Sequence, residues 1–255
     1  MVHGTSLLAV DAAARRGIGR LGVRVLWADV PEFEPPAAGV APAECFDGLL
    51  SAGEITRADG YRRPADRGRF VAGRALLRLA AGDVLDRPPA DVGIAAHCPL
   101  CGSTGHGRLS VPSTPSVQLS STRGGGRVAV AVARSPHPIG IDLEPDCAAG
   151  FAGFDDVALT PSERARVLAL PPSQRAVART RAWVQKEAVL KARGTGLSVD
   201  PAGTDPADSP YVVTDIDVGP GYRCSLATTT RPSVTVIDAT RRLAALAVPV
   251  PTARP

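Results

Sequence analysis

Residues 116–144 decide the fold class, and they read SVQLSSTRGGGRVAVAVARSPHPIGIDLE. Residues 116–120 and 128–133 alternate in side-chain character on either side of three glycines, which is typical of a β-hairpin. Residues 139–144 predict another strand soon after it. Apolar residues at helical spacing over 66–79 predict a long helix ahead of the hairpin. Helices and antiparallel strands mixed in this way indicate an α+β fold.

The second part of the chain repeats this pattern. A second long helix is predicted over residues 174–192, and a second hairpin over 211–218 and 222–229. The stretch 70–78 aligns with 183–191 at a constant offset of 113, although Ala and Leu are common enough here for a chance match. We expect two similar halves related by a pseudo-two-fold axis, each a helix packed on a small antiparallel sheet.

Composition narrows the functional classes. The formal net charge of +4 favours an anionic partner such as a phosphate ligand, an acidic protein or nucleic acid. Only 4% of the residues are aromatic, whereas a nucleic-acid binder of this kind needs aromatic side chains among its basic ones. No apolar run approaches the roughly 20 residues of a membrane helix, and five scattered cysteines indicate free thiols. We expect a cytoplasmic protein with neither nucleic-acid nor membrane partners.

Two groups of residues carry candidate chemistry. Asp142 and Glu144 alternate on one strand, so their side chains point to the same side. Trp183, Glu187 and Lys191 follow at i, i+4 and i+8, on one face of a helix. Carboxylate oxygens favour magnesium, and the tryptophan indicates that the helix face is partly buried. The alternatives are an exposed sheet edge for the two acids and an ordinary surface ion pair for Glu187 and Lys191.

The arrangement of these groups resembles a known family. Gly140-Ile141-Asp142-Leu143-Glu144 lies about forty residues ahead of Trp183-x-x-Lys186-Glu187-Ala188-x-x-Lys191. This pair of motifs is similar to the signature of 4′-phosphopantetheinyl transferases. The long chain with two halves resembles the Sfp (surfactin-synthetase-activating) type, and the resemblance covers roughly residues 60–230.

The resemblance implies magnesium-dependent transfer of the 4′-phosphopantetheine arm of coenzyme A to a serine of an apo acyl or peptidyl carrier protein, with release of 3′,5′-ADP. Asp142, Glu144 and Glu187 are the implied ligands of Mg²⁺, for which Mn²⁺ substitutes. Glu187 is the implied base for the serine, and Lys191 the implied partner of the leaving phosphate. The carriers are acidic and the enzyme a monomer. The alternative is an inactive module that binds coenzyme A or a carrier.

The sequence and the resemblance together predict how the chain is divided. We expect residues 1–20 to form a loosely held segment, the half 21–137 to contact the nucleotide of coenzyme A, and the half 138–255 to hold the metal site and the catalytic helix. The residues expected to bind coenzyme A are Arg63, Arg69, Arg108, Ser120, Ser121, Lys186 and Lys191.

One position departs from the family pattern. Ser121 stands where the family commonly has a histidine that meets a coenzyme A phosphate. A serine hydroxyl donates a hydrogen bond but carries no positive charge. Either an arginine such as Arg123 meets that phosphate, or coenzyme A binds less tightly.

A cysteine pair outside these motifs leaves two interpretations open. Cys98 and Cys101, with His97 and His106 nearby, resemble a zinc knuckle. The C-x₂-C spacing supplies only half of a zinc site, and neighbouring His97 and Cys98 are awkwardly placed to bind one ion. We favour a loop that presents Arg108 over a zinc site.

Overall fold

The computed structural model describes residues 21–30, 46 and 48–246. The strands are β1 (Leu21–Asp29), β2 (Ala95–His97), β3 (Arg108–Ser110), β4 (Val117–Gly124), β5 (Arg127–Arg134), β6 (Gly140–Pro145), β7 (Val212–Asp215), β8 (Tyr222–Thr228) and β9 (Pro232–Asp238). The helices are α1 (Ala52–Asp59), α2 (Pro64–Leu85), α3 (Phe154–Ala158), α4 (Pro161–Leu168), α5 (Pro172–Arg193) and α6 (Thr240–Leu246). No helix among the described residues is long and apolar enough to cross a membrane.

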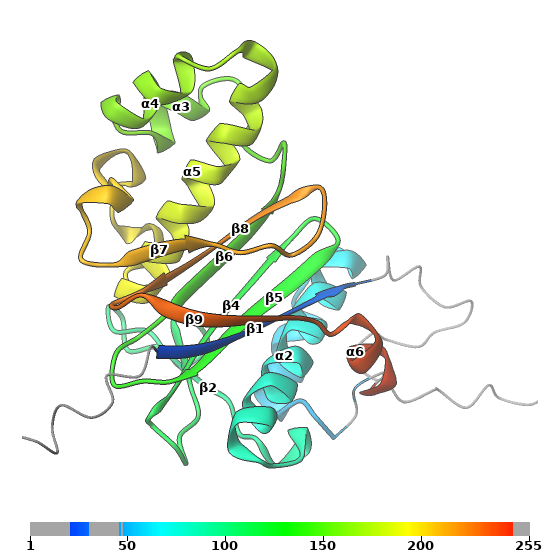
Figure 1. Ribbon diagram of the computed structural model, residues 1–255. Coiled ribbons are helices and arrows are strands. Elements are labelled where there is room, and N and C mark those ends of the chain that lie inside the picture. Colours follow the sequence, from blue (N-terminus) through cyan, green and yellow to red (C-terminus); the bar gives the residue numbers. More distant parts are fainter. Residues whose placement is uncertain (1–20, 31–45, 47, 247–255) are drawn as a thin grey trace, which may run out of the picture.

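Two sheets form the framework of the fold (Figure 1). One has six strands in the order β2-β3-β4-β5-β1-β9, and the other has three in the order β6-β8-β7. β9 runs parallel to β1, with Val234 opposite Val23, whereas the remaining strand pairs are antiparallel. The last strand of the chain therefore returns to the sheet that the first half builds.

Serine and threonine hydroxyls join the two sheets where β4 lies beside β6. Ser120 Oγ accepts a hydrogen bond from the backbone N–H of Ile141 at 3.0 Å. Thr122 Oγ1 accepts one from the N–H of Leu143 at 3.2 Å and donates one to Asp142 Oδ1 at 2.8 Å. These side chains satisfy buried backbone donors that a direct strand pairing would otherwise satisfy. They also fix β6 at the position from which its acidic residues emerge.

The alternating sequence of β5 explains why this strand is buried on both faces. Its valines, such as Val130 and Val132, pack with α2 in one core cluster. Its alanines, such as Ala129 and Ala131, pack with β1, β6 and β8 in a second cluster. Burying a valine side chain contributes roughly 1.5–3 kcal/mol, and small alanines let the second sheet approach closely.

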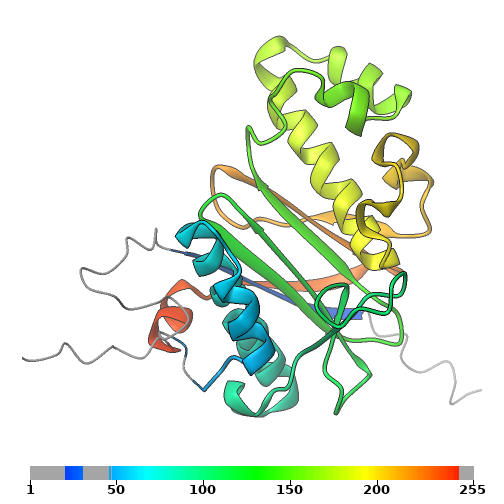
Figure 2. The same cartoon turned by 180° about the vertical axis from the view of Figure 1, so that it is seen from behind.

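The long helices α2 and α5 lie on the same side of their sheets (Figure 2). α2 covers β4 and β5, while α5 covers β6 and β8. Both helices have 22 residues and begin with a proline, which suits the first turn because that turn needs no N–H donor. The strands β4 and β6 lie between them, so the facing sides of the two helices form the walls of one pocket.

The α+β class and the main elements are confirmed, with a helix on a sheet in each half. The helix expected from residue 66 begins at Pro64 and extends to Leu85. Six elements were not predicted: α1, α3, α6, β2, β3 and β9. The expected segment 1–20 lies outside the described residues. The division at residue 138 stays a prediction, and β9 and α6 pack on the first half across it.

Candidate functional site

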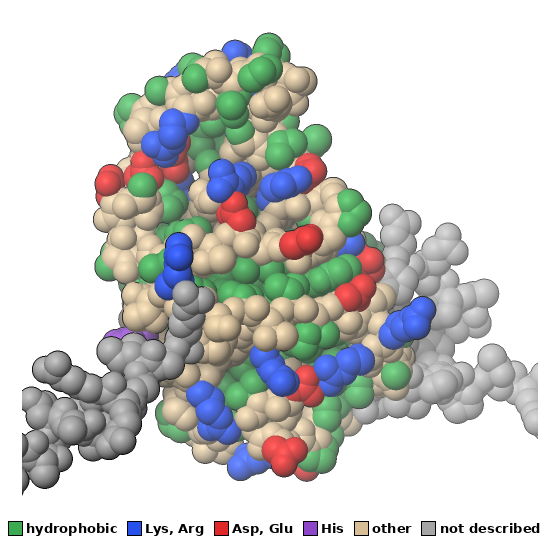
Figure 3. All heavy atoms as spheres, viewed as in Figure 1, with side chains coloured by type: hydrophobic (Ala, Val, Ile, Leu, Met, Phe, Trp, Pro, Cys, Tyr) green, Lys and Arg blue, Asp and Glu red, His purple; other side chains and the backbone are tan. Residues whose placement is uncertain are grey.

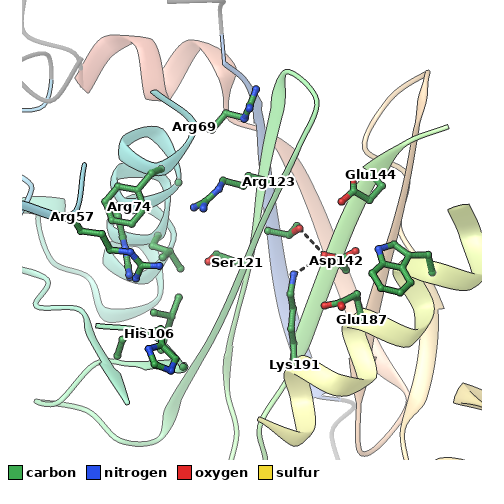
Figure 4. Close-up of a pocket in the computed structure, with 18 residues that line it drawn as sticks. Arg57, Arg69, Arg74, His106, Ser121, Arg123, Asp142, Glu144, Glu187 and Lys191 are labelled. Atoms are coloured by element: carbon green, nitrogen blue, oxygen red, sulfur yellow. Dashed lines mark hydrogen bonds and ion pairs between the residues drawn. The ribbon is translucent and has the colours of Figure 1, made fainter. Parts of the chain in front are cut away.

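A cavity of about 400 Å³ separates α2 from α5. Figure 4 shows basic side chains on the α2 side, acidic side chains on the α5 side, and Ser121 of β4 between them. On the outer face in Figure 3, by contrast, basic and acidic side chains are interspersed. The cavity therefore concentrates charge that the rest of this surface disperses, as expected of a site for a charged ligand.

The acidic wall combines a strand and a helix. Asp142 and Glu144 project from the same side of β6, and Glu187 projects toward them from α5. Gly140 lets the strand and the helix meet: a Cβ atom there would clash with the backbone oxygen of Ala188 and lie 2.6 Å from the backbone nitrogen of Ala192. A side chain at position 140 would push β6 away from α5 and separate the three carboxylates.

Two buried oxygen atoms of the acidic wall, Asp142 Oδ2 and Glu187 Oε1, have no hydrogen-bond partner among the residues that the structure describes. Such atoms are costly unless they receive a cation or a donor. Burial, with the charges of Asp142 and Glu187, raises the pKa of Glu144 to about 7, and nearby Lys191 opposes this. Burial is also the largest cause of the raised pKa of Glu187. Orphaned oxygens in a triad of repelling carboxylates fit a hard divalent cation.

Lys191 lies at the centre of this wall. Its ammonium group donates to Asp142 Oδ1 at 2.6 Å and to the backbone oxygen of Ile141 at 3.2 Å. Its side chain is 28% exposed, toward the cavity. An ammonium has three N–H donors, so one of them is free for a ligand.

The basic wall is an arginine cluster built around Phe70 of α2. The guanidinium carbons of Arg57, Arg74 and Arg123 lie 5.2, 5.3 and 5.8 Å from the centre of the Phe70 ring. Arg123 also donates a 2.8 Å hydrogen bond to the Tyr61 hydroxyl. Among these three arginines, and counting only partners in the described part of the chain, Arg74 alone has a carboxylate partner, Glu54 at 3.4 Å. The cluster therefore keeps a net positive charge toward the cavity.

The offset of 113 residues has a structural counterpart here. Phe70 and Arg74 of α2 correspond to Trp183 and Glu187 of α5, and all four line the cavity. Each helix thus supplies an aromatic residue and, one turn later, a charged one. The charges have opposite signs, so equivalent positions build opposite walls.

The loop between β2 and β3 closes the cavity at one end. His106 and Gly107 line it, and Arg108 lies in an adjoining hollow that also contains Ser121 and Lys191. Arg108 donates a 3.1 Å hydrogen bond to the backbone oxygen of Ala192, near the C-terminal end of α5. The loop thereby bridges the two walls.

Of the residues expected at coenzyme A, the structure brings Arg69, Ser121 and Lys191 to the cavity and Arg108 beside it. Arg69 is turned partly outward, since it pairs with Asp66 at 2.5 Å. Arg63 is exposed at the start of α2 and does not line the cavity. Its expected ligand contact therefore finds no support here.

Two residues expected at coenzyme A make other contacts in the structure. The hydroxyl of Ser120 is engaged by the backbone of β6, although Ser120 also lines the hollow beside the cavity. Lys186 is fully buried and turned away from the cavity. Five residues along a helix turn a side chain by roughly 140°, so Lys186 lies on a different face from Lys191.

Sequence reasoning missed Arg57 and did not assign roles to Arg74 and His106. Arg57 lies on α1, which carries no motif, and only the packing of α1 against α2 brings it to Phe70. Arg74 did carry a signal, because the offset of 113 places it opposite Glu187. A charged residue one turn after an aromatic residue on a buried helix face is the pattern that identifies it.

Comparison with known proteins agrees with the position of this site. Residues 138–240 match the family model of the 4′-phosphopantetheinyl transferase superfamily. The chain is also 30% identical over 152 residues to 4′-phosphopantetheinyl transferase HetI of Nostoc sp. (strain PCC 7120 / SAG 25.82 / UTEX 2576). That match covers 58% of this chain and 61% of HetI, so the chain spans about three fifths of this relative's length. The region matched by the family model contains the whole acidic wall and Lys191, so this part of the site is similar to the 4′-phosphopantetheinyl transferase superfamily.

Proposed function

We propose that the protein transfers the 4′-phosphopantetheine arm of coenzyme A to a serine of an apo acyl or peptidyl carrier protein and releases 3′,5′-ADP. One observation carries this proposal. Three acidic side chains with two orphaned oxygens stand at one side of a cavity whose other side is an arginine cluster. Arginine clusters bind phosphates, and an acidic group at their edge suits the metal ion of a phosphoryl transfer.

Asp142, Glu144 and Glu187 are the residues that would hold Mg²⁺, and Mn²⁺ would substitute for it. When bound, the ion neutralises charge on the pyrophosphate of coenzyme A and so makes its phosphorus easier to attack. The protein contributes three oxygens of different origin, two from β6 and one from α5. Their positions are set by the strand-to-helix contact at Gly140 and by the hydrogen bond of Thr122 to Asp142.

Proton transfer is the task of Glu187. The serine oxygen bonds to the phosphorus that carries the pantetheine arm, and the bond from that phosphorus to the bridging oxygen of the leaving group breaks. The serine proton passes to the Glu187 carboxylate, directly or through water. Burial favours the protonated form of Glu187, as its raised pKa indicates. Lys191 offers its free N–H to the leaving phosphate, where negative charge develops.

The phosphates of coenzyme A are the proposed ligands of the arginine cluster. Arg74, Arg123 and Arg57 offer guanidinium groups, and Ser121 between the walls offers a hydroxyl. Guanidinium forks bind phosphate oxygens in pairs. The cluster thus supplies the positive charge that Ser121 lacks. Arg69 and Arg108 lie at the margins and would act on the same phosphates at longer range.

The carrier protein is proposed to dock at an apolar groove beside the acidic wall. Phe151, Val157 and Leu197 are 60%, 62% and 60% exposed and line this groove. Glu144 and Trp183 line both the groove and the cavity. A serine on a carrier docked here would reach the acidic wall directly, and the net charge of +4 favours an acidic carrier. We propose a monomer that acts in the cytoplasm.

The transferase is tested with coenzyme A, magnesium and an apo carrier protein, by following the intact mass of the carrier. We expect the carrier to gain the phosphopantetheine arm, no gain in excess EDTA, and recovery when magnesium is restored. Glu187→Gln is expected to lower the rate at least ~10³-fold, because it removes both a metal ligand and the base. Asp217→Asn is the matched control, since this acid is exposed outside the cavity.

The alternative function, an inactive module that binds coenzyme A or a carrier, is favoured by Ser121, which replaces the usual histidine. The same experiment must therefore distinguish the two functions. The module would bind coenzyme A, detected by calorimetry, and leave the carrier mass unchanged at every metal concentration. That result with several apo carriers would overturn the transferase.

A further inference from the structure

Three potential metal ligands gather outside the acidic wall, on the loop between β2 and β3. The ligand atoms of Cys98, Cys101 and His106 all lie within 4.8 Å of one another. Cys101 Sγ and His106 Nε2 are 3.4 Å apart. In the part of the chain that the structure describes, no disulfide ties up these sulfurs. Two thiols and an imidazole are the soft and borderline ligands that zinc prefers.

The backbone after Cys98 forms a turn that suits a metal-bound thiolate. The N–H of Gly102 donates to the backbone oxygen of Cys98, and the N–H of Cys98 donates to that of Ser103, both at 2.9 Å. Gly102 has a φ of +71°, which glycine adopts without strain. Backbone N–H groups of Cys101 and Leu100 donate to the Cys98 sulfur and hold the pKa of its thiol below the usual value. These donors stabilise the charge that a zinc-bound sulfur carries.

A close backbone contact brings His106 to the two cysteines. A Cβ atom on Gly107 would clash with the backbone oxygen of His97 and lie 2.5 Å from Cys98 Cα. Gly107 also has a φ of +102°. Only glycine lets the chain pass this close, and the preceding residue, His106, is thereby held beside Cys101. The fold of the loop therefore holds the backbone of the third ligand, His106, close to the two cysteines.

We propose that Cys98 Sγ, Cys101 Sγ and a ring nitrogen of His106 bind one Zn²⁺, with water as the fourth ligand. On binding, each thiol releases its proton to solvent, and the two thiolates balance the charge of the ion. The role of the zinc ion is structural, because it holds the loop between β2 and β3 in place. This loop lines the cavity with His106 and Gly107, and its Arg108 donates a hydrogen bond to the backbone of α5. This site is separate from the acidic wall and does not depend on the transferase activity.

Metal content tests the site on the full-length protein, purified without a polyhistidine tag. We expect about one zinc ion per chain by plasma mass spectrometry. Cys101→Ala and His106→Ala should retain at least ~10-fold less zinc after dialysis, because two ligands hold zinc weakly. Both residues are exposed, so the variants should fold. His106→Cys keeps a zinc ligand and should recover the metal. Cys147→Ala, which changes an exposed cysteine outside the cluster, should keep zinc unchanged.

Cobalt substitution identifies the ligands independently. Co²⁺ added to the zinc-free, reduced protein should give a thiolate-to-cobalt charge-transfer band that is absent from Cys101→Ala and present in Cys147→Ala. The site is overturned if the reduced protein takes up no zinc or cobalt, or if the variants bind as much as the parent. A Cys98–Cys101 disulfide in protein purified from a reducing cytoplasm would also overturn it. None of these readouts uses transfer activity, so an inactive protein with full zinc content would reject the transferase alone.

Discussion

The only two lysines of the chain lie on one helix and end in opposite environments. Lys186 is fully buried, and its ammonium donates to Glu163 Oε2 and to the backbone oxygens of Ala158 and Pro201 at 2.6–2.7 Å. Lys191 is partly exposed and donates to Asp142 Oδ1 and one backbone oxygen. The first ammonium has used all three donors within the protein, and the second has used two.

The difference shows that two lysines of one motif can differ in how many N–H donors the protein itself uses. Glu163 also accepts from the backbone N–H of Thr160 at 2.8 Å and so caps α4. Lys186 thus joins the end of α3, the start of α4 and the turn at Pro201, which encloses its charge completely. Lys191 lies where three carboxylates and a cavity leave its charge accessible. A saturated ammonium stabilises a fold, whereas an unsaturated one at a cavity can receive a phosphate.

Removing Lys186, whose three N–H donors are all used within the protein, should have the largest effect on stability. Lys186→Met leaves Glu163 charged and buried without its partner, which typically costs about 3–5 kcal/mol. We expect the urea midpoint to fall accordingly, while the folded fraction keeps its affinity for coenzyme A. Glu163→Gln added to Lys186→Met removes the orphaned charge and keeps an acceptor for Thr160, so it should restore part of the loss. A loss below about 1 kcal/mol would show that water enters this site.

Removing Lys191, which keeps one N–H donor free, should affect the transfer rate more than the stability. Lys191→Met is expected to lower the transfer rate about 10²-fold, comparable to the loss of one transition-state donor. Its stability with magnesium present should fall by only about 1–2 kcal/mol, because one hydrogen-bonded partner is lost at a partly exposed site. Kinetics and urea unfolding on the same preparations measure both values. A Lys191→Met protein as unstable as Lys186→Met would remove the distinction between the two sites.

Strand and helix periodicity predicted that Asp142 and Glu144 share one side of a strand and that Glu187 and Lys191 share one face of a helix. Only the family resemblance implied that these two groups meet in one site. The same periodicity separates Lys186 from Lys191, yet it does not say which face meets the ligand. The face that meets the ligand depends on which strands α5 covers. Lys186 instead pairs with the carboxylate of Glu163, which lies 23 residues away in the sequence. Glu163 belongs to the capping box at the start of α4, and nothing in the sequence of that capping box indicates that Glu163 has a second partner.

Long-range packing explains the remaining differences. β9 pairs in parallel with β1 across most of the chain length, and parallel pairing leaves no hairpin signal near either strand. The arginine cluster combines α1, α2 and β4, none of which carries all of it. The strand expected to present Ser120 to a ligand instead turns that residue toward β6. Alternation correctly predicts that Ser120 and Ser121 face opposite sides, but not which side is the cavity.

The acidic wall beside Lys191 should also make the stability of the protein depend on pH. The folded-state pKa of Glu144 is about 7, above its ordinary value of 4.5. Metal-free protein should therefore lose stability as the pH rises from about 5 to about 8, because the folded state holds a proton that the unfolded state has released. We expect a fall in thermal midpoint of about 2–4 °C, and magnesium should reverse it most at high pH. Glu144→Gln should flatten the profile; an unchanged slope would place the titration elsewhere.

The prediction with the smallest expected effect asks whether the arginine cluster already neutralises the negative charge of the ligand's phosphate. Ser121→His introduces the histidine that is common in the family that the sequence resembles, on the same strand as Arg123 and across the cavity from Lys191. Below about pH 6.5 the added imidazolium should tighten coenzyme A binding by about 0.5–1.5 kcal/mol, the range of one net hydrogen bond. Repulsion from Arg74 and Arg123 limits the gain, and Ser121→Asn controls for an uncharged donor. Calorimetry between pH 5.5 and 8 measures the difference. A gain well above tenfold would mean that the cluster leaves the phosphate unpaired, whereas equal affinities for parent and variant across this range would show that arginine meets it fully.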